Sequence, residues 1–221
     1  MHENPQPHAG LFLTFEGGDG SGKTTQARLA AQWLSDTYAH DALLTREPGG
    51  TELGQHIRQL LLHGDDMGPR AEALLYAADR SHHVHTVIRP ALSLGRTVVC
   101  DRYFDSSIAY QGGGRTLTPE TIRDLSLWAV DGLIPDVTVL IDVPARVGAA
   151  RREGEPDRLE RAGDDFHDTT HATYRHLAEQ EPERWVIVDG IGTIDEVADR
   201  VRAALVDRLG ARVTTRAQGR S

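Results

Sequence analysis

The stretch that decides the fold is Gly17-Gly18-Asp19-Gly20-Ser21-Gly22-Lys23-Thr24, which fits the pattern G-x-x-x-x-G-K-[ST]. A short apolar segment with β-branched and aromatic residues precedes it at 11–15, and a segment with apolar residues at helical spacing follows at 25–34. Strand, glycine loop and helix in this order form a phosphate cradle. The sequence therefore predicts that this loop binds a nucleoside triphosphate.

The residue types in the loop match that chemistry. Glycines let the backbone turn successive N–H groups inward, and the following helix adds the positive end of its dipole. We expect Lys23 to reach the β- and γ-phosphates and the Thr24 hydroxyl to hold Mg²⁺. The predicted ATP-binding residues are Gly17, Gly18, Asp19, Gly20, Ser21, Gly22, Lys23, Thr24 and Thr25.

Composition narrows the class of protein. The 221 residues and 39% hydrophobic content are typical of a soluble protein with a single main domain, expected at 11–209. We expect a flexible leader at 1–10 and a disordered tail at 210–221. The polar N-terminus and the lack of a long apolar run predict a cytoplasmic protein with no membrane partner. The net charge of −9 argues against nucleic-acid binding, and Cys100, the one cysteine, is expected to be buried and inert.

Five short apolar segments alternate with helical ones, which predicts a parallel sheet covered by helices on both faces. The expected strands are 11–15, 42–45, 97–100, 137–142 and 185–188. The expected helices are 23–38, 51–62, 70–94 with a kink or break at Pro90, 119–131 with Thr118 as N-cap, 145–151, 164–179 and 194–209. Residues 105–111, followed by three glycines, are expected to form a mobile loop edge.

Polar segments gather where these strands end. In proteins with parallel sheets, ligands bind beyond the carboxyl ends of the strands. Asp101 directly follows a strand, which is the placement of a carboxylate that acts on Mg²⁺. Arg46 and Arg102 also follow strands, and guanidinium groups suit a site that holds two phosphorylated substrates. The alternative for each arginine is a surface salt bridge.

Four arginines surround a break near Gly154: Arg151, Arg152, Arg158 and Arg161. They fit a hinged lid that brings cationic charge to a transferred phosphoryl group, and equally a solvated helix face among interleaved acidic residues.

Two other patterns are weak. His167 and His171 are four residues apart, but no third ligand is evident, so we expect an exposed helix face and not a metal site. Ser106 and Ser107 have no candidate base, which leaves a serine hydrolase unsupported.

Four segments together resemble one family, the bacterial thymidylate kinases: FEGGDGSGKTTQ (15–26), TREPGGT (45–51), LLYAADRSHH (74–83) and CDRYFDSSIAYQG (100–112). The resemblance covers roughly residues 12–205. It implies an α/β P-loop NTPase three-layer fold, with a five-stranded parallel sheet and a small helical lid at about 150–163. It also implies transfer of the γ-phosphate of ATP to dTMP with Mg²⁺, and a homodimer.

The resemblance also implies residue roles. Asp19 accepts from the sugar 3′-OH, Arg46 and Arg102 clamp the acceptor phosphate, and Tyr103 packs beside C2′. Arg80 and Gln111 read the thymine edge, while Glu16 supports the site. The implied substrate-binding set is Asp19, Arg46, Glu47, Pro48, Tyr76, Arg80, Arg102, Tyr103, Ser106, Ser107, Tyr110 and Gln111. The implied catalytic set is Lys23, Arg102, Arg151, Arg152 and Arg158, with Thr24 and Asp101 at the metal.

Two positions depart from the family pattern. Tyr76 stands where a thymine-stacking phenylalanine is expected, and Glu153 where a basic residue is expected. Gly20 leaves the loop without an arginine, which resembles the type that supplies arginines from the lid. Two alternatives stay open: a kinase for another monophosphate such as UMP or CMP, and a nucleotide-dependent switch or partition protein. The absence of an N-K-x-D segment argues against a switch GTPase.

Overall fold

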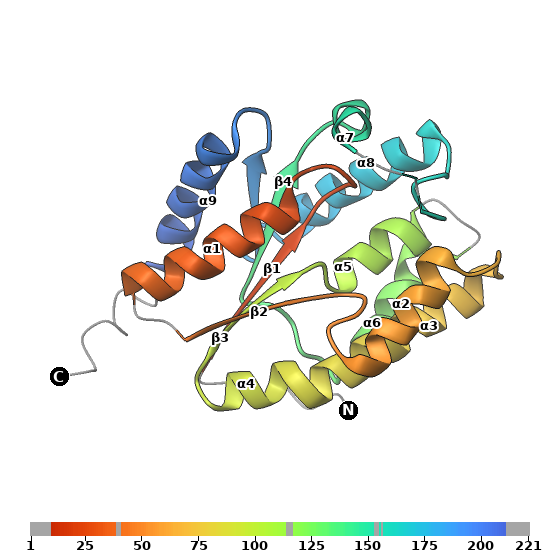
Figure 1. Ribbon diagram of the computed structural model, residues 1–221, viewed down its shortest axis with the longest axis horizontal. Coiled ribbons are helices and arrows are strands. Elements are labelled where there is room, and N and C mark those ends of the chain that lie inside the picture. Colours follow the sequence, from red (N-terminus) through yellow and green to blue (C-terminus); the bar gives the residue numbers. More distant parts are fainter. Residues whose placement is uncertain (1–9, 39–40, 114–116, 153–154, 156, 211–221) are drawn as a thin grey trace.

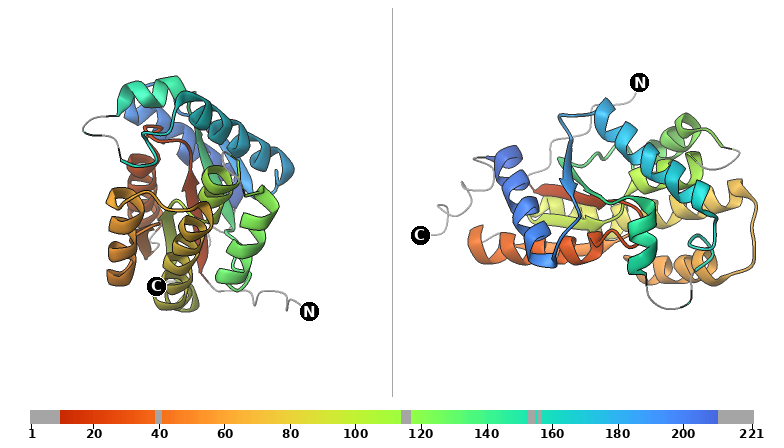
Figure 2. Two further views of the ribbon diagram at one scale, coloured as in Figure 1. Left: turned by 90° about the vertical axis from the view of Figure 1, so that its right-hand side faces the viewer. Right: turned by 90° about the horizontal axis from the view of Figure 1, so that it is seen from above.

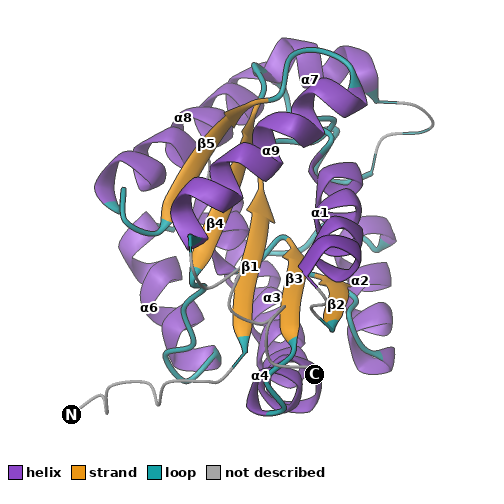
Figure 3. Ribbon diagram, turned by 90° about the vertical axis from the view of Figure 1, so that its left-hand side faces the viewer, coloured by secondary structure: helices purple, strands orange, loops and turns teal. Residues whose placement is uncertain are grey.

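The computed structural model describes residues 10–38, 41–113, 117–152, 155 and 157–210. Five parallel strands form one sheet in the order β2-β3-β1-β4-β5 (Figure 3). The strands are β1 Leu11–Glu16, β2 Ala42–Arg46, β3 Thr97–Asp101, β4 Val137–Asp142 and β5 Trp185–Asp189. The predicted parallel sheet is confirmed. The expected leader and tail lie almost entirely outside the described residues.

The helices are α1 Lys23–Tyr38, α2 Glu52–His63, α3 Pro69–His83, α4 Arg89–Ser93, α5 Phe104–Ser107, α6 Pro119–Ala129, α7 Ala145–Arg151, α8 Asp164–Gln180 and α9 Ile194–Leu209, with π-helical segments η1 Val84–Ile88 and η2 Ile108–Gly112 (Figure 1). Threonine side chains cap several of them. Thr118 accepts from the Thr121 backbone N–H, as the sequence predicts, and Thr193 forms a capping box with Glu196. No helix within the described part is both long and apolar enough to cross a membrane.

The alternation of side chains along β1 divides the core into two layers. Leu13 and Phe15 face one layer, which α1 and α9 cover, and Phe12 faces the other, which α2 to α6 and α8 cover. Figure 2 shows α1 and α9 side by side on their face of the sheet. The central strands β1, β3 and β4 are buried almost throughout, whereas the edge strand β2 is only partly buried. A sheet buried on both faces explains the continuous apolar runs in the sequence.

Two helical predictions needed correction. The expected helix over 70–94 is three pieces, because the backbone widens at η1, where Arg89 N–H donates to Val84 O five residues earlier. This widened turn comes directly before Pro90, which has no N–H to donate. The mobile loop expected at 105–111 was wrong. That segment is helical in α5 and η2, because Ile108 and Ala109 pack into the core and the glycines come only after them.

Candidate active site

The loop between β1 and α1 is held open by its glycines. Gly17 and Gly20 have φ angles of 144° and 77°, which side chains rarely adopt. A Cβ atom on Gly20 would meet the backbone of Gly148 in α7, and one on Gly148 would meet the Asp19 carbonyl. The loop and α7 therefore touch backbone to backbone, and there is no room for an arginine side chain at position 20.

Lys23 is the buried cation of the loop. Its Nζ donates to Gly18 O at 3.2 Å and lies 3.9 Å from Asp19 Oδ1. Burial lowers the pKa of Lys23, as does the nearby charge of Arg102, while neighbouring carboxylates oppose the shift. A bound anion would favour the charged form of this lysine.

Thr24 and Asp101 form a donor set suited to a hard cation. Thr24 Oγ1 donates to Asp101 Oδ2 at 2.5 Å. The other carboxylate oxygen, Oδ1, is buried and has no hydrogen-bond partner within the described residues. Oxygen ligands of this kind, hydroxyl and carboxylate, are those that Mg²⁺ prefers. The two residues thus fit the metal site that the sequence predicts.

Arg102 carries its charge into the space beside the phosphate loop. Its φ of 68° is unusual for a residue with a side chain and costs about 1–3 kcal/mol. The guanidinium donates to Asp19 Oδ1 at 2.5 Å and to the Tyr110 hydroxyl at 3.2 Å. It also donates to the hydroxyls of Ser106 and Tyr174 at 3.0 and 3.1 Å. The strained backbone aims this cation at the loop, where a phosphate would lie.

Asp19 joins the loop to the neighbouring cavity. Its Oδ2 accepts from the Tyr110 hydroxyl at 2.7 Å. Burial raises the pKa of Asp19, but the charges of Arg102 and Lys23 and the Tyr110 hydrogen bond outweigh it and hold this pKa well below its usual range. Asp19 is therefore an ionised acceptor that can bind a ligand hydroxyl.

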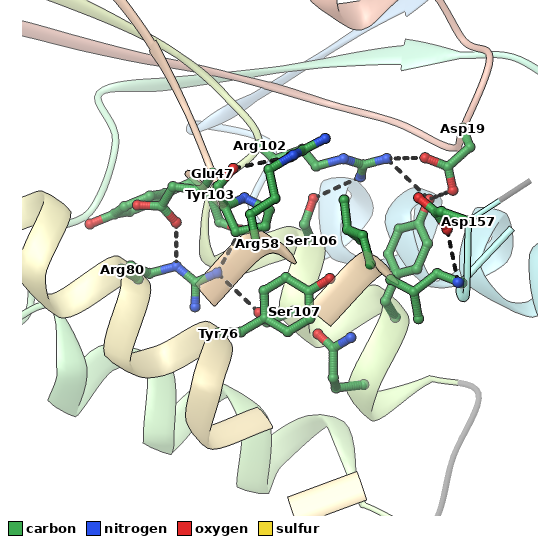
Figure 4. A pocket seen from close by; sticks show the side chains of 15 residues that line it. Asp19, Glu47, Arg58, Tyr76, Arg80, Arg102, Tyr103, Ser106, Ser107 and Asp157 are labelled. Atoms are coloured by element: carbon green, nitrogen blue, oxygen red, sulfur yellow. Dashed lines mark hydrogen bonds and ion pairs between the residues drawn. The ribbon is translucent and has the colours of Figure 1, made fainter. Parts of the chain in front are cut away.

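A cavity opens beside Asp19 (Figure 4). All but one of the residues expected to bind the acceptor line it: Asp19, Glu47, Pro48, Tyr76, Arg80, Arg102, Tyr103, Ser106, Ser107, Tyr110 and Gln111. The exception is Arg46, whose side chain is exposed at the end of β2.

A buried ion pair fixes Arg80 at the inner end of this cavity. Arg80 Nε donates to Glu47 Oε2 at 2.7 Å, and Nη2 donates to Ser107 Oγ at 3.0 Å (Figure 4). The other Glu47 oxygen lies 2.9 Å from His83 Nδ1, and His83 Nε2 lies 2.7 Å from Thr45 Oγ1. Arg80 Nη1 is buried with no hydrogen-bond partner within the described residues, so a donor remains for a ligand.

Glu16 supports the cavity from behind, at the end of β1. Its carboxylate accepts from the Tyr103 backbone N–H at 2.7 Å, the Ser106 hydroxyl at 2.6 Å and the Tyr174 hydroxyl at 3.1 Å. Burial, together with the charge of Asp105, raises the pKa of Glu16 to about 7. Every oxygen of this side chain already has a partner, which suits a supporting role.

Some lining residues escaped the sequence reasoning. Arg58 of α2 donates to Pro48 O at 3.0 Å and lines the cavity, and burial together with the charge of Arg46 lowers its pKa. Asp157 and Leu159, which lie within the expected lid at about 150–163, line it as well. Arg58 could have been suggested by its position, because it is a basic residue on the helix that follows the 45–51 segment. Nothing local in the sequence indicated the other two.

The three expected lid arginines lie in different surroundings. Arg151 donates to Gly190 O at 3.1 Å and borders a hollow shared with Gly20–Gln26 of the loop. Arg152 lines a smaller hollow beside Gly18 and Asp19. Arg158 borders none of these spaces; it is buried against α2 and α3. Residues 153, 154 and 156, including the unexpected Glu153, lie outside the described residues.

Two further predictions have clear outcomes. Cys100 is buried, as expected, and burial raises its pKa well above the ordinary value. The exposed face expected for the histidine pair was wrong. His167 lies 3.3 Å from Glu160 O, His171 lies 2.7 Å from Asp142 Oδ1, and both rings are partly buried.

Comparison with known proteins decides the family. The family model for thymidylate kinase matches residues 15–201. The chain belongs to the thymidylate kinase family. It is 50% identical over 211 residues to the thymidylate kinase of Leifsonia xyli subsp. xyli, covering 93% of this chain and 99% of the relative. It is 52% identical over 197 residues to that of Clavibacter michiganensis subsp. michiganensis, covering 87% and 93%.

A solved structure agrees. Thymidylate kinase from Ehrlichia chaffeensis superposes with a TM-score of 0.74 at 34% identity, covering 90% of this chain and 99% of that one. The resemblance inferred from four sequence segments is thereby confirmed, as are the three-layer fold and the transferase class. The chain is a kinase that phosphorylates dTMP, and neither the UMP or CMP kinase nor the switch protein is favoured.

Proposed function

We propose that the protein transfers the γ-phosphoryl group of Mg²⁺-bound ATP to the 5′-phosphate of dTMP, giving dTDP and ADP. The observation that carries this proposal is the contact between Asp19 and Arg102. It places a loop residue and an acceptor-side residue at one point, so that a triphosphate in the loop and a nucleotide in the cavity would meet there. Phosphoryl transfer depends mainly on such positioning and on charge.

The donor half comprises residues 17–25. Inward N–H groups and Lys23 would hold the β- and γ-phosphates, and Thr24 and Asp101 would hold Mg²⁺. When bound, Mg²⁺ neutralises charge on the phosphate oxygens. The hollow that borders this loop continues along Gly190–Thr193, a space for the rest of the donor nucleotide.

The acceptor half is the cavity beside Asp19. Arg102 would bind the 5′-phosphate, with the exposed Arg46 and neighbouring Arg58 adding cationic charge. Asp19 would accept from the 3′-OH, while Tyr103 packs below the sugar. The unpaired Nη1 of Arg80 supplies a donor for a base carbonyl, and the Tyr76 ring lines the cavity for stacking. The remaining contacts come from Glu47, Pro48, Ser106, Ser107, Tyr110 and Gln111.

The attacking group needs no general base. The acceptor is already a phosphate oxygen of low proton affinity, so no residue has to remove a proton from it. Charge stabilisation falls to Lys23, Arg102 and an arginine of the lid. Of the lid residues, Arg151 and Arg152 border the loop, and one of them would reach the transferred group.

A coupled assay of ADP release tests this function. ADP release should require dTMP and divalent metal, and should be much faster with dTMP than with dCMP or UMP. Equal turnover of the three would contradict the base and sugar assignments. ATP hydrolysis that ignores dTMP would contradict the kinase mechanism itself.

We further propose a cytoplasmic homodimer that pairs through α3 and α6. Trp128 is 78% exposed on α6 and Leu74 is 58% exposed on α3. With Ala77, Ala78, Leu125 and Ala129 they line an apolar hollow on the surface. A second copy of the same surface would cover these side chains, since isologous pairing is the commonest way to build a dimer.

A further inference from the structure

Arg158 and Glu72 form a buried ion pair outside the phosphate-binding region. Arg158 Nη2 lies 2.6 Å from Glu72 Oε2, and the two side chains are 5% and 0% exposed. Arg158 also donates from Nε to Leu61 O at 2.9 Å, and its backbone N–H donates to Leu62 O at 3.2 Å. This part of the chain is thus fastened to the end of α2, and one guanidinium nitrogen of Arg158 faces Glu72.

The second oxygen of Glu72 controls another side chain. Gln111 Nε2 donates to Glu72 Oε1 at 3.0 Å, and Gln111 is buried in the wall of the acceptor cavity. A glutamine amide has a donor end and an acceptor end. Because a carboxylate only accepts, the amide nitrogen of Gln111 has to face Glu72, which leaves its carbonyl oxygen for the cavity.

This orientation distinguishes between pyrimidines. Thymine carries a hydrogen on N3 and can donate to a carbonyl oxygen, whereas N3 of cytosine has no hydrogen and can only accept. We propose that the Arg158–Glu72 pair sets the base selectivity of the cavity by fixing the orientation of the Gln111 amide. The proposal rests on the proposed function, in which Gln111 contacts the base, and it makes Arg158 a positioning residue.

Replacing the carboxylate by an amide provides the sharpest test. In Glu72→Gln, the positive charge of Arg158 attracts the amide oxygen, so the new amide nitrogen faces Gln111. The Gln111 amide then turns over and presents its NH₂ group to the base. We expect the kcat/KM ratio of dTMP to dCMP to fall by about tenfold, the scale of one buried hydrogen bond. The ratio of dTMP to dUMP should not change, because both bases carry the N3 hydrogen.

Arg158 is tested by a pair of variants. Arg158→Met removes the Arg158 charge from beside the buried Glu72, which favours a protonated carboxyl that can donate to the Gln111 carbonyl. It should lose selectivity against dCMP as Glu72→Gln does, and Arg158→Lys should restore it. An arginine that acts on the transferred phosphoryl group would instead lower kcat equally for dTMP, dUMP and dCMP in both variants and leave the ratios unchanged.

The outcomes separate this inference from the function on which it rests. Wild-type enzyme with no preference for dTMP over dCMP would contradict the proposed function. Normal wild-type preference with an unchanged ratio in folded Glu72→Gln would overturn the inference alone. If the single variants do not fold, Glu72→Gln/Arg158→Met removes both charges together, which buried pairs tolerate better. In that variant Arg158 no longer orients the amide at position 72, so an unchanged ratio would again overturn the inference.

Discussion

At the scale of single residues, the site depends on one strained arginine. The φ of 68° at Arg102 is an unfavourable backbone conformation, and it directs the guanidinium to Asp19 and the loop. The same residue contacts three hydroxyls of the acceptor side. The same residue therefore carries both a functional contact and backbone strain. Substitutions should change activity and stability separately.

Arg102→Ala should reduce kcat/KM for dTMP by about 10²-fold or more, because a charged hydrogen-bonding partner of the phosphate is lost, while the KM for ATP changes little. Arg102→Gly is the matched control. It should lose as much activity, yet be about 1 kcal/mol more stable to urea than the alanine variant, since glycine accepts positive φ. A loss confined to ATP affinity would place Arg102 on the other substrate.

Asp79 gives the fold a defined dependence on pH. Burial and the charge of Glu47 raise the pKa of Asp79 to about 6, while its Oδ1 accepts from Gly49 N–H at 3.2 Å. The folded state then binds more protons than the unfolded state between about pH 4 and pH 6, so this contribution to stability is present at low pH and is lost as pH rises through that window.

We expect Asp79→Asn to remove that dependence, because an amide can keep the bond from Gly49 without charge. The free energy of unfolding of the variant, relative to wild type, should rise by about 2 kcal/mol from pH 4 to pH 8. Urea titrations of the ligand-free enzymes at both pH values measure this change. Parallel pH profiles for the two proteins would show that Asp79 is not the group responsible.

At the scale of elements, the C-terminal end of α7 and the residue that caps it carry the arginines that border the loop. Single substitutions Arg151→Ala and Arg152→Ala should leave one variant with kcat reduced by about 10³-fold, the effect of a transition-state arginine. Arg146→Ala on the exposed side of the same helix is the control and should have near-normal kcat. Rapid-quench measurement of a single turnover distinguishes chemistry from product release. Near-normal rates in both variants would exclude α7 as the source of that charge.

Strand and helix positions were predictable because they follow local apolar periodicity, which the sheet and its two helical layers impose. The prediction failed where tertiary packing outweighed local signals. The glycines after Gln111 suggested a loop, yet Ile108 is drawn into the core and makes the segment helical. Pro90 indicated a break in its helix, but the accommodating turn lies before it, at Val84–Ile88.

The residues of the candidate site also fall into a group that the sequence predicts and a group that it does not. Residues that belong to compact motifs, such as Lys23 or Arg102, could be predicted from sequence and lie at the cavity or the loop. Partners joined only by the fold could not. Arg158 contacts a carbonyl 97 positions earlier in the chain, and the local sequence pattern cannot predict a contact between residues so far apart. Its expected place in the lid came from proximity in sequence alone.

At the scale of the whole molecule, the exposed face of α3 and α6 is the feature that a single chain leaves uncovered. Trp128→Asp should convert the proposed dimer to a monomer, because a buried unpaired carboxylate at an apolar interface is costly. Light scattering coupled to gel filtration measures the mass. Leu44→Asp, on the exposed edge strand, is the control and should leave the mass unchanged. Trp33→Asp would not serve, because Trp33 packs on the core. A monomeric wild type would refute the pairing.

The contact between Gly20 and Gly148 has a mechanical consequence. The backbone of Gly20 lies against the carbonyl oxygen of Gly148, and the backbone of Gly148 lies against that of Asp19. Gly148 is the fourth of the seven residues of α7, so Arg151 lies about 5 Å further along the helix axis. The position of the phosphate loop and the position of Arg151 are therefore coupled through this contact. A side chain at either glycine would push α7, and this cation with it, away from the loop.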